Sequence, residues 1–473
     1  MRQKIIIRVD GSKSIGLGHL IRCIALAQML KDKFEITFAY MDVPDEYIAQ
    51  FKELGFLKLY LESEDHFFDQ LDNACIVVLD GYNFKIEYQK KIKEIGCKLV
   101  CIDDLHEDVF AADLIINHAP GVQPENYRTL GNVDFALGLN YALLRPIFLK
   151  QATISRKIDE VKTVLVCFGG ADYLDLTLKT LQVIAKLPQF KKIIVITGAS
   201  YTYGSSLNAF IENDNRIYRY HAASEVQMLE LMLESDIAVV PTSGVFLEVL
   251  TTGCRIVSGT YANNQKVFFE RFRAEGLLFD ANDFSEEQLL KALHQALTLH
   301  AITKKLIDGR SGIRLLDKFT NLSLNIRKVE VRDCELLFNW ANDVDVRMNA
   351  VSNKPIVWEE HVKWLNAKLS SGKTFIFLLM QNTLPVGQIR YDLDEKDNAY
   401  FIDYSIAKDF RGNGFGKKIV KMTLALLKGV KVKAIVQNTN TGSIRVFESL
   451  NFNEKESVEI NQIKYRTFEY IVV

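Results

Sequence analysis

The sequence lacks three features, and each absence argues against a class of function. Positive and negative charges cancel almost completely, with 58 Lys and Arg against 59 Asp and Glu, so no strong field favours nucleic acid or an anionic membrane surface. No apolar run approaches the roughly 18 residues needed to span a bilayer. The seven cysteines show no CxxC or Cys/His metal spacing, so we expect reduced thiols in a cytoplasmic protein that holds no metal.

The composition is typical of a globular protein with more than one domain. Of the 473 residues, 48% are hydrophobic and 25% are charged, and a chain of this length is expected to divide into two or three domains. The first strand-like run, Lys4–Val9, begins almost at the first residue. We therefore expect no signal peptide.

Short apolar runs alternate with amphipathic helical segments through residues 1–155 and again through residues 156–315. This alternation predicts an α/β fold with two parallel sheets and right-handed crossovers, as two Rossmann-like halves with a cleft between them. Ligands of such sheets bind at the carboxyl ends of the strands. The expected strands are Lys4–Val9, Glu35–Tyr40, Ile76–Leu79, Leu99–Ile102, Leu114–Asn117, Thr163–Phe168, Lys192–Ile196 and Ile237–Val240.

The pattern changes after a polar, glycine-containing segment, and we interpret residues 316–327 as a linker. Residues 328–473 are expected to form an α+β domain. In it, two helices come first and an antiparallel meander follows. A third helix, a strand, a fourth helix and a final strand complete the domain. The expected elements are helices Cys334–Asn342, Trp358–Leu369, Gly416–Leu427 and Gly442–Leu450, and strands Thr374–Met380, Pro385–Tyr391, Asn398–Ile406, Lys431–Val436 and Tyr465–Val472.

A first glycine-rich loop, Gly16-Leu17-Gly18-His19, follows the first expected strand and opens the first expected helix. Backbone N–H groups and the positive end of a helix can hold an anion at such a place, and glycine permits a close backbone approach. A helix N-terminus disfavours the imidazolium form, and neutral His19 can then accept a proton from water. The alternative is a histidine that only caps or packs the helix.

Two later strand–helix junctions carry residues suited to a nucleotide. Gly169-Gly170 follows one expected strand and could bind phosphate. Ser243 and Gly244 follow another and could do the same, while Glu248, one turn into the next helix, could accept hydrogen bonds from both ribose hydroxyls. Glu248 could equally be an ordinary solvated helix residue.

Four elements of residues 1–315 together resemble one family. They are similar to the UDP-sugar hydrolase of pseudaminic acid biosynthesis, which removes UDP from UDP-2,4-diacetamido-2,4,6-trideoxy-β-L-altropyranose. The resemblance implies a GT-B fold with His19 as the general base. The chain departs from the family at Pro241-Thr242, where small residues are common. The four elements are Gly16–Arg22, Tyr-Ala-Leu-Leu-Arg-Pro at Tyr141–Pro146, Gly169-Gly170, and Ser243 with Glu248.

The predicted substrate site of this hydrolase half contains further polar residues. Asn264 and Gln265 offer amides suited to sugar hydroxyls or an acetamido group, although a turn would also explain them. The residues predicted to bind substrate in this half are Asp10, Gly16, Gly18, Arg22, Gly169, Gly170, Ser243, Gly244, Glu248, Asn264 and Gln265.

A second glycine-rich loop, Arg411–Lys417, follows the expected strand ending at Ile406 and opens a helix. It resembles the Arg/Gln-x-x-Gly-x-Gly/Ala signature of the GNAT N-acetyltransferases, which implies that its amides surround the pyrophosphate of acetyl-CoA. The preceding strand is then expected to pair with the pantetheine arm and to direct an N–H toward the thioester oxygen. The residues predicted to bind acetyl-CoA are Ile406, Ala407, Arg411, Gly412, Asn413, Gly414, Gly416, Lys417 and Asn440.

The C-terminal segment departs from the GNAT pattern twice. Asn451 stands where glycine is usual, and Phe447 stands where a tyrosine often protonates the leaving thiolate. The proton donor is therefore open: CoA thiolate is a tolerable leaving group, and another tyrosine or water could serve. Asn339–Asp343 and Glu359–Trp364 resemble GNAT enzymes acting on nucleotide-linked 4-amino sugars, which implies that His361 contacts the sugar nucleotide. The alternative for His361 is a histidine on a mostly exposed helix face.

These resemblances together imply a bifunctional enzyme of pseudaminic acid biosynthesis whose partners are a UDP-linked amino sugar and acetyl-CoA, without nucleic acid, membrane insertion or metal. Two alternatives stay open at this point. One is a GT-B glycosyltransferase fused to a GNAT domain that modifies another amino sugar. The other is a non-catalytic sensor of sugar nucleotides.

Overall fold

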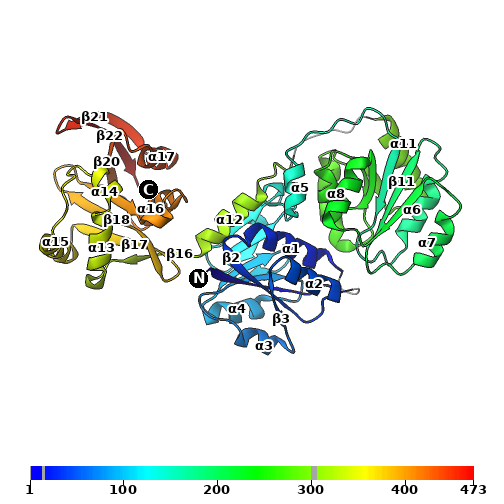
Figure 1. The fold of residues 1–473 in the computed structure, drawn as a ribbon, viewed down its shortest axis with the longest axis horizontal. Helices are drawn as coiled ribbons and strands as arrows, with labels where there is room; N and C mark the ends of the chain where they lie inside the picture. Colours follow the sequence, from blue (N-terminus) through cyan, green and yellow to red (C-terminus); the bar gives the residue numbers. More distant parts are fainter. Residues whose placement is uncertain (1, 13–15, 300–305, 473) are drawn as a thin grey trace. The chain divides into compact units, whose positions relative to one another are not determined.

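The computed structural model describes residues 2–12, 16–299 and 306–472 of the chain. They form two compact units, Met1–Leu322 and Ser323–Val473 (Figure 1). Two parallel sheets form the framework of the first unit, and one mixed sheet forms that of the second. Within the described ranges, no helix is long and apolar enough to cross a membrane.

The first sheet of the N-terminal unit has the strand order β3-β2-β1-β4-β5-β7-β9, and all of its neighbouring strands are parallel. Helices connect most of the strands, as expected from the alternating pattern. A short pair, β6 (Val109–Phe110) with β8 (Arg128–Thr129), lies outside this sheet. The elements are β1 (Gln3–Val9), α1 (Gly18–Leu30), β2 (Phe34–Tyr40), α2 (Asp45–Glu53), β3 (Leu57–Tyr60), α3 (Glu64–Asp69), β4 (Ile76–Asp80), α4 (Ile86–Ile95), β5 (Lys98–Ile102), β7 (Leu114–Asn117) and β9 (Asp134–Leu137).

The second sheet has the order β12-β11-β10-β13-β14-β15, again with every pair parallel. This is the order of the Rossmann fold, and its crevice lies where the order reverses, between β10 and β13. The first sheet reverses in the same way between β1 and β4. The elements are β10 (Thr163–Cys167), α6 (Leu176–Ile184), β11 (Lys192–Thr197), α7 (Gly204–Ile211), β12 (Ile217–His221), α8 (Glu225–Glu234), β13 (Ile237–Pro241), α9 (Gly244–Leu250), β14 (Arg255–Gly259), α10 (Lys266–Ala274), β15 (Phe279–Asn282) and α11 (Glu286–Thr298).

Both faces of the inner strands of each parallel sheet are buried, which explains why these strands are nearly continuous apolar runs. In β1, Ile5 and Ile7 pack on one side with α1, whereas Ile6 faces the opposite core. In β10, Val164 and Val166 face one core and Leu165 faces the other. The core that contains Ile6 and Leu165 also includes α5 (Pro146–Gln151), so one apolar cluster joins the two halves of this unit.

The predicted linker at residues 316–327 is wrong. Residues 316–322 complete helix α12 (Ser311–Leu322), whose Leu315 and Phe319 are fully buried in the core of the first sheet. Phe319 packs edge-to-face on Phe34, with ring centroids 6.3 Å apart. The next residues belong to β16 (Leu324–Lys328), an edge strand of the C-terminal sheet. The polar composition of this segment reflects the exposed side of an amphipathic helix.

The C-terminal unit is built on a sheet of order β16-β17-β18-β19-β20-β22-β21. Its neighbours are antiparallel except β19 and β20, which pair in parallel only over Ala399–Phe401 and Lys431–Lys433. Beyond Phe401, β19 keeps its ladder with β18 while no ladder to β20 continues. The strands thus separate immediately before the second glycine-rich loop. The elements are α13 (Cys334–Ala341), α14 (Val344–Asn349), α15 (Trp358–Ser370), β17 (Thr374–Gln381), β18 (Leu384–Asp394), β19 (Ala399–Ile406), α16 (Phe415–Leu424), β20 (Lys431–Gln437), α17 (Thr441–Ser449), β21 (Asn453–Ile460) and β22 (Ile463–Ile471).

Candidate active sites

His19 and Asp80 form a buried pair at the point where the order of the first sheet reverses. His19 is the second residue of α1, which follows β1, and Asp80 is the last residue of β4, the neighbour of β1. The His19 Nδ1 atom lies 2.6 Å from Asp80 Oδ1. Nδ1 also lies 3.0 Å from Arg22 NH2, which can only donate, but its contact with the ionised Asp80 carboxylate, which can only accept, is much shorter, so we assign the proton to Nδ1. The other ring nitrogen, Nε2, is therefore left to accept a proton.

Arg22 lies one turn after His19 and holds the Asp80 carboxylate from the other side. Its Nε and NH2 atoms each donate to one oxygen of Asp80 at 2.6 Å, and NH1 donates to Asp104 at 2.5 Å. Burial alone would raise the pKa of Asp80, but the Arg22 guanidinium and the His19 ring hold that pKa far below its ordinary value. Asp80 is therefore an ionised carboxylate, ready to stabilise positive charge on His19.

Tyr82 completes this cluster. Its ring meets the His19 ring edge-to-face at 4.9 Å, and its hydroxyl donates to Asp104 at 3.3 Å. Asp80, Tyr82 and Asp104 were not predicted from the sequence. A signal was present, because Asp80 ends one strand and Asp104 follows the next strand of the sheet, and carboxyl ends of parallel strands meet at one edge.

The first glycine-rich loop lies against the loop that follows β10. Gly16 has a positive φ of 87°, a conformation that favours glycine. Leu17 is buried beside Gly170, where a Cβ would come within 2.6 Å of the Leu17 side chain. Through Leu17, the loop that contains Gly16, Gly18 and His19 thus contacts the loop that contains Gly169-Gly170. The two loops follow strands of two different sheets.

The helix that follows Gly169-Gly170 is capped by a side chain of the protein. The first amides of α6 are already hydrogen-bonded, because the Asp172 carboxylate accepts from Leu176 N at 2.9 Å and from Thr177 N at 2.8 Å. These two α6 amides are therefore not available to a phosphate. Gly170 instead provides close packing, and any contact of these glycines with phosphate stays a prediction.

Glu248, on the helix that follows β13, is buried and forms an ion pair, so it is not an ordinary solvated helix residue. Arg145, from the Leu-Leu-Arg-Pro segment, donates to Glu248 Oε1 through Nε at 3.0 Å and NH2 at 2.7 Å. Burial raises the pKa of Glu248, and the Arg145 guanidinium opposes that rise. Both hydrogen bonds go to Oε1, which leaves Oε2 as the acceptor for a ligand.

Of the other predicted substrate residues, Asp10 and Gln265 make hydrogen bonds within the protein. Ser243 precedes α9 without a capping hydrogen bond from its side chain, and Gly244 at the helix start is exposed. The Asp10 carboxylate accepts from Met41 N at 2.7 Å and Asp42 N at 3.0 Å, which holds the loop after β2. Gln265 Oε1 accepts from Tyr261 N at 3.0 Å. The side chain of Asn264 lies outside the described residues.

The second glycine-rich loop has the backbone that its sequence predicts. Gly412 and Gly414 have φ of 78° and 76°, and a Cβ at either position would meet no atom within 4 Å. The loop therefore faces open space on its glycine side. Gly416 is different, because a Cβ there would come within 3.1 Å of the Tyr404 ring.

Two predicted acetyl-CoA ligands use their side chains to hold the loop region together. Arg411 donates to Asp343 and to Asp345, both at 2.6 Å, and its Nε donates to the Ile406 carbonyl at 3.0 Å. Asn440 caps α17 by accepting from Ser443 N at 3.1 Å. Asn413 and Lys417 are exposed. Backbone groups, rather than the Arg411 side chain, are thus left to meet a cofactor.

The side chain of His361 packs among aromatic rings and does not lie on an exposed helix face. It is buried at 3% exposure, between the rings of Phe338 at 5.6 Å and Trp364 at 5.3 Å. Burial lowers its pKa. A contact between His361 and a sugar nucleotide stays a prediction, and it requires these aromatic side chains to move.

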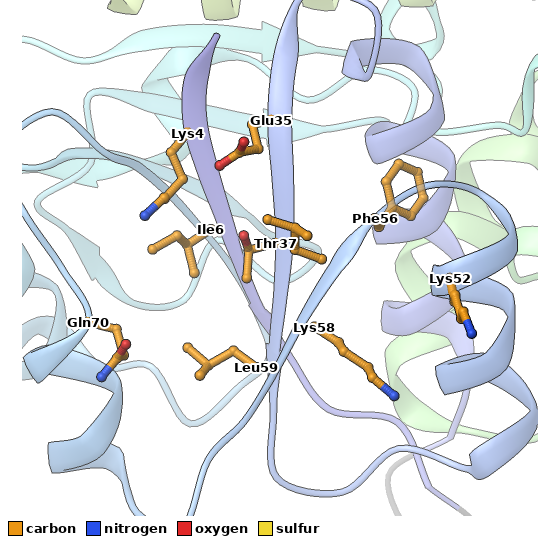
Figure 2. Close-up of a pocket in the computed structure, with 10 residues that line it drawn as sticks. Lys4, Ile6, Glu35, Thr37, Lys52, Phe56, Lys58, Leu59 and Gln70 are labelled. Atoms are coloured by element: carbon orange, nitrogen blue, oxygen red, sulfur yellow. The ribbon is translucent and has the colours of Figure 1, made fainter. Parts of the chain in front are cut away.

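A hollow of about 510 Å³ on the first sheet is separate from these clusters. Strands β1, β2 and β3 line it with Ile6, Thr37 and Leu59, and Lys4 and Glu35 lie near the starts of their strands (Figure 2). None of its lining residues belongs to the His19 cluster, and it mixes charged with apolar groups. In the described part of the chain, no group of three or more His, Cys, Asp or Glu is arranged to hold a metal ion.

Comparison with known proteins agrees with the two-unit architecture. Residues 323–453 match the model of the acetyltransferase (GNAT) domain, so the C-terminal unit is a GNAT domain. An uncharacterized protein of Methanocaldococcus jannaschii, MJ1062, is 26% identical over 98% of this chain and 99% of its own.

Two further relatives match the N-terminal region. The UDP-2,4-diacetamido-2,4,6-trideoxy-beta-L-altropyranose hydrolase of Campylobacter jejuni is 26% identical over 56% of this chain and 93% of its own. The spore coat polysaccharide biosynthesis protein SpsG of Bacillus subtilis is 22% identical over 65% of this chain and 94% of its own. The chain therefore joins a region similar to a UDP-sugar hydrolase to a GNAT domain.

The Arg145–Glu248 pair predicts a pH-dependent stability in a variant. Arg145→Met leaves a buried carboxylate without its cation, which typically costs about 3–5 kcal/mol. Because the folded-state pKa of Glu248 is raised, the penalty is absent below the unfolded-state pKa and grows as pH rises through the folded-state pKa. The melting temperature of Arg145→Met should therefore be closer to wild type at low pH than at high pH, as measured by thermal unfolding.

The matched control is the double variant Arg145→Met with Glu248→Gln, in which no carboxylate remains to titrate. Its difference from wild type should depend much less on pH. An Arg145→Met deficit that is the same across the acidic and alkaline range would contradict this role of the pair.

Proposed function

We propose that the chain is a bifunctional enzyme that acetylates and then hydrolyses a UDP-linked amino sugar. The C-terminal unit transfers an acetyl group from acetyl-CoA to the 4-amine of UDP-4-amino-4,6-dideoxy-N-acetyl-β-L-altrosamine. The N-terminal unit hydrolyses the product, UDP-2,4-diacetamido-2,4,6-trideoxy-β-L-altropyranose, to UDP and the free sugar. The observation that carries the proposal is the buried His19–Asp80 pair, in a region similar to a hydrolase of that substrate.

In the hydrolase unit, His19 acts as the general base. Nδ1–H is held by Asp80, so Nε2 takes a proton from water while the water oxygen attacks the anomeric carbon. UDP leaves from the opposite face, and the anomeric carbon is inverted. The Asp80 carboxylate fixes the tautomer and the orientation of the ring and stabilises the imidazolium that forms.

The nucleotide is bound mainly by the second half of this unit. The Gly244 amide at the start of α9 and the Ser243 hydroxyl donate to the phosphates, since the Ser243 N–H already donates to the Pro241 carbonyl at 2.9 Å. Glu248 accepts from the ribose hydroxyls through Oε2, while Arg145 keeps the carboxylate charged and in place. This arrangement requires no metal ion.

In the GNAT unit, the described residues fit acetyl-CoA. The backbone around Gly412 and Gly414 faces open space at the start of α16, where amides can surround a pyrophosphate. The end of β19 has no ladder partner beyond Phe401 on its β20 side, so its N–H and C=O groups there can pair with an extended pantetheine arm. Acetyl-CoA supplies the activated acetyl group.

Removal of the His19 imidazole tests the proposed general base. His19→Ala should lower UDP release by about 10²–10⁴-fold, the contribution typical of general-base catalysis. Acetyl transfer by the same protein should be unchanged. His294→Ala replaces an exposed histidine on α11; it is the matched control and should keep the wild-type rate.

UDP release in the absence of any acceptor also separates a hydrolase from a glycosyltransferase, which would release almost no UDP.

Near wild-type hydrolysis by His19→Ala would remove this residue from the mechanism.

Asp80 gives a second, independent prediction. Asp80→Asn keeps the shape of the side chain but removes the charge that fixes the His19 tautomer, so UDP release should fall by at least about 10²-fold. UDP affinity, measured by calorimetry, should stay close to wild type. Asp113→Asn is the control, because Asp113 pairs with Lys93 in the same half at 2.5 Å and is not part of the His19 cluster. Full turnover by Asp80→Asn would show that the pair is only structural.

Substitution of two glycines with similar positive φ, one inside the loop and one outside it, tests whether the loop binds acetyl-CoA. Gly414→Val should abolish acetyl-CoA binding, because its Cβ projects into the space where the pyrophosphate meets bare backbone. Gly429→Val is the matched control, since Gly429 has a similar φ of 68° and no neighbour within 4 Å, but lies outside the loop. Both variants carry the same kind of backbone strain, and only the control should bind acetyl-CoA by calorimetry.

UDP release from the diacetamido substrate should survive in both glycine variants. If Gly414→Val binds acetyl-CoA as tightly as Gly429→Val does, the loop is not the cofactor site.

A further inference from the structure

Tyr404 lies at the place where β19 and β20 separate. It is three residues beyond Phe401, the last residue of β19 that pairs with β20. Its hydroxyl donates to Ser443 Oγ, in the first turn of α17, at 3.0 Å. Its ring fills the space that Gly416 leaves open at the start of α16. A half-buried tyrosine is thus held between the strand and the two helices that border the predicted acetyl-CoA site.

The next turn of α17 carries Phe447, so it has no tyrosine hydroxyl to offer at this position. The Phe447 side chain is 2% exposed and packs on Phe452 and Phe468, with ring centroids 5.0 and 5.6 Å away. Residues 443 and 447 lie one turn apart on the same face of the helix. The Tyr404 hydroxyl, bonded to Ser443, therefore stands one turn from Phe447, and the two rings are 6.0 Å apart.

The other polar side chains of this stretch have different partners. Successive residues of a strand face opposite sides, so Asp403 points away from Tyr404, and it lies 3.2 Å from Arg390. Ser405 accepts from Gln388 at 3.3 Å. Burial raises the pKa of Tyr404 to about 12, against the smaller opposing effect of its bond to Ser443. Tyr404 therefore keeps its proton at neutral and moderately alkaline pH.

We propose that Tyr404 protonates the thiolate that leaves during acetyl transfer, an inference that rests on the proposed acetyltransferase function. The neutral amine attacks the thioester carbonyl carbon, a C–N bond forms, and the C–S bond breaks with its electron pair going to sulfur. The Tyr404 hydroxyl gives its proton to that sulfur. The acetylated nitrogen loses one proton to solvent, and solvent returns a proton to the tyrosinate, so the products are the amide and free CoA thiol.

The test uses the full chain with acetyl-CoA and the UDP-linked 4-amino sugar, and follows the release of free thiol. Tyr404→Phe should lower kcat by about 10²-fold or more, the range of acid–base catalysis, while acetyl-CoA affinity by calorimetry stays within about twofold of wild type. Tyr391→Phe is the matched control. Its hydroxyl is buried in the same unit and bonded to Thr423 Oγ1 at 2.7 Å, away from the loop, so kcat should be unchanged.

Three outcomes would overturn the inference. The first is a wild-type kcat in Tyr404→Phe. The second is a loss of kcat matched by an equal loss of acetyl-CoA affinity, which would make Tyr404 a packing residue. The third is the absence of thiol release by the wild-type chain, which would overturn the proposed acetyl transfer as well. If the wild-type and Tyr391→Phe proteins release thiol, either of the first two outcomes refutes only the role of Tyr404 and leaves the proposed acetyl transfer intact.

Discussion

One buried carboxylate, Asp80, sets the geometry of the predicted hydrolase site. It accepts from His19 on one side and from Arg22 on the other, and Arg22 in turn reaches Asp104. A buried charge without such partners is costly, whereas here every oxygen of Asp80 has a donor. The same contacts that stabilise the charge also determine which nitrogen of His19 can accept a proton. Stability and chemistry thus depend on one set of hydrogen bonds, and the order of the sheet, with β1 beside β4, brings the partners together.

The second half of the N-terminal unit repeats this principle with a different pair. Glu248 is buried in the helix after β13 and is neutralised by Arg145, which lies 103 residues earlier in the chain. Because Arg145 belongs to the segment that leads into α5, the pair connects the predicted nucleotide site to the connection between the two sheets. In the C-terminal unit, the analogous constraint is steric: Gly416 has no side chain, and Tyr404 occupies that space.

Much of the fold followed from the sequence, because buried parallel strands are apolar runs and glycine-rich loops mark the strand–helix junctions. The sequence indicated both glycine-rich loops and His19, whereas β12, with its polar Tyr-Arg-Tyr-His, and the short β15 gave no apolar run and were missed. The predicted linker was wrong because half of α12 is exposed and polar. Asp80 and Asp104 stand at the carboxyl ends of neighbouring strands, a signal that the sequence contained, but their hydrogen-bond partners, like that of Tyr404, are distant in sequence and are brought together only by the tertiary structure.

The central claim is that acetylation precedes hydrolysis on one substrate. The most direct measurement incubates the full chain with the UDP-linked 4-amino sugar, with and without acetyl-CoA, and follows N-acetylated sugar nucleotide and UDP over time. The account predicts that the acetylated sugar nucleotide forms first, that UDP and the free diacetamido sugar follow, and that little UDP appears without acetyl-CoA. Release of UDP at the same rate without acetyl-CoA, or accumulation of the acetylated sugar nucleotide with no release of UDP, would contradict it.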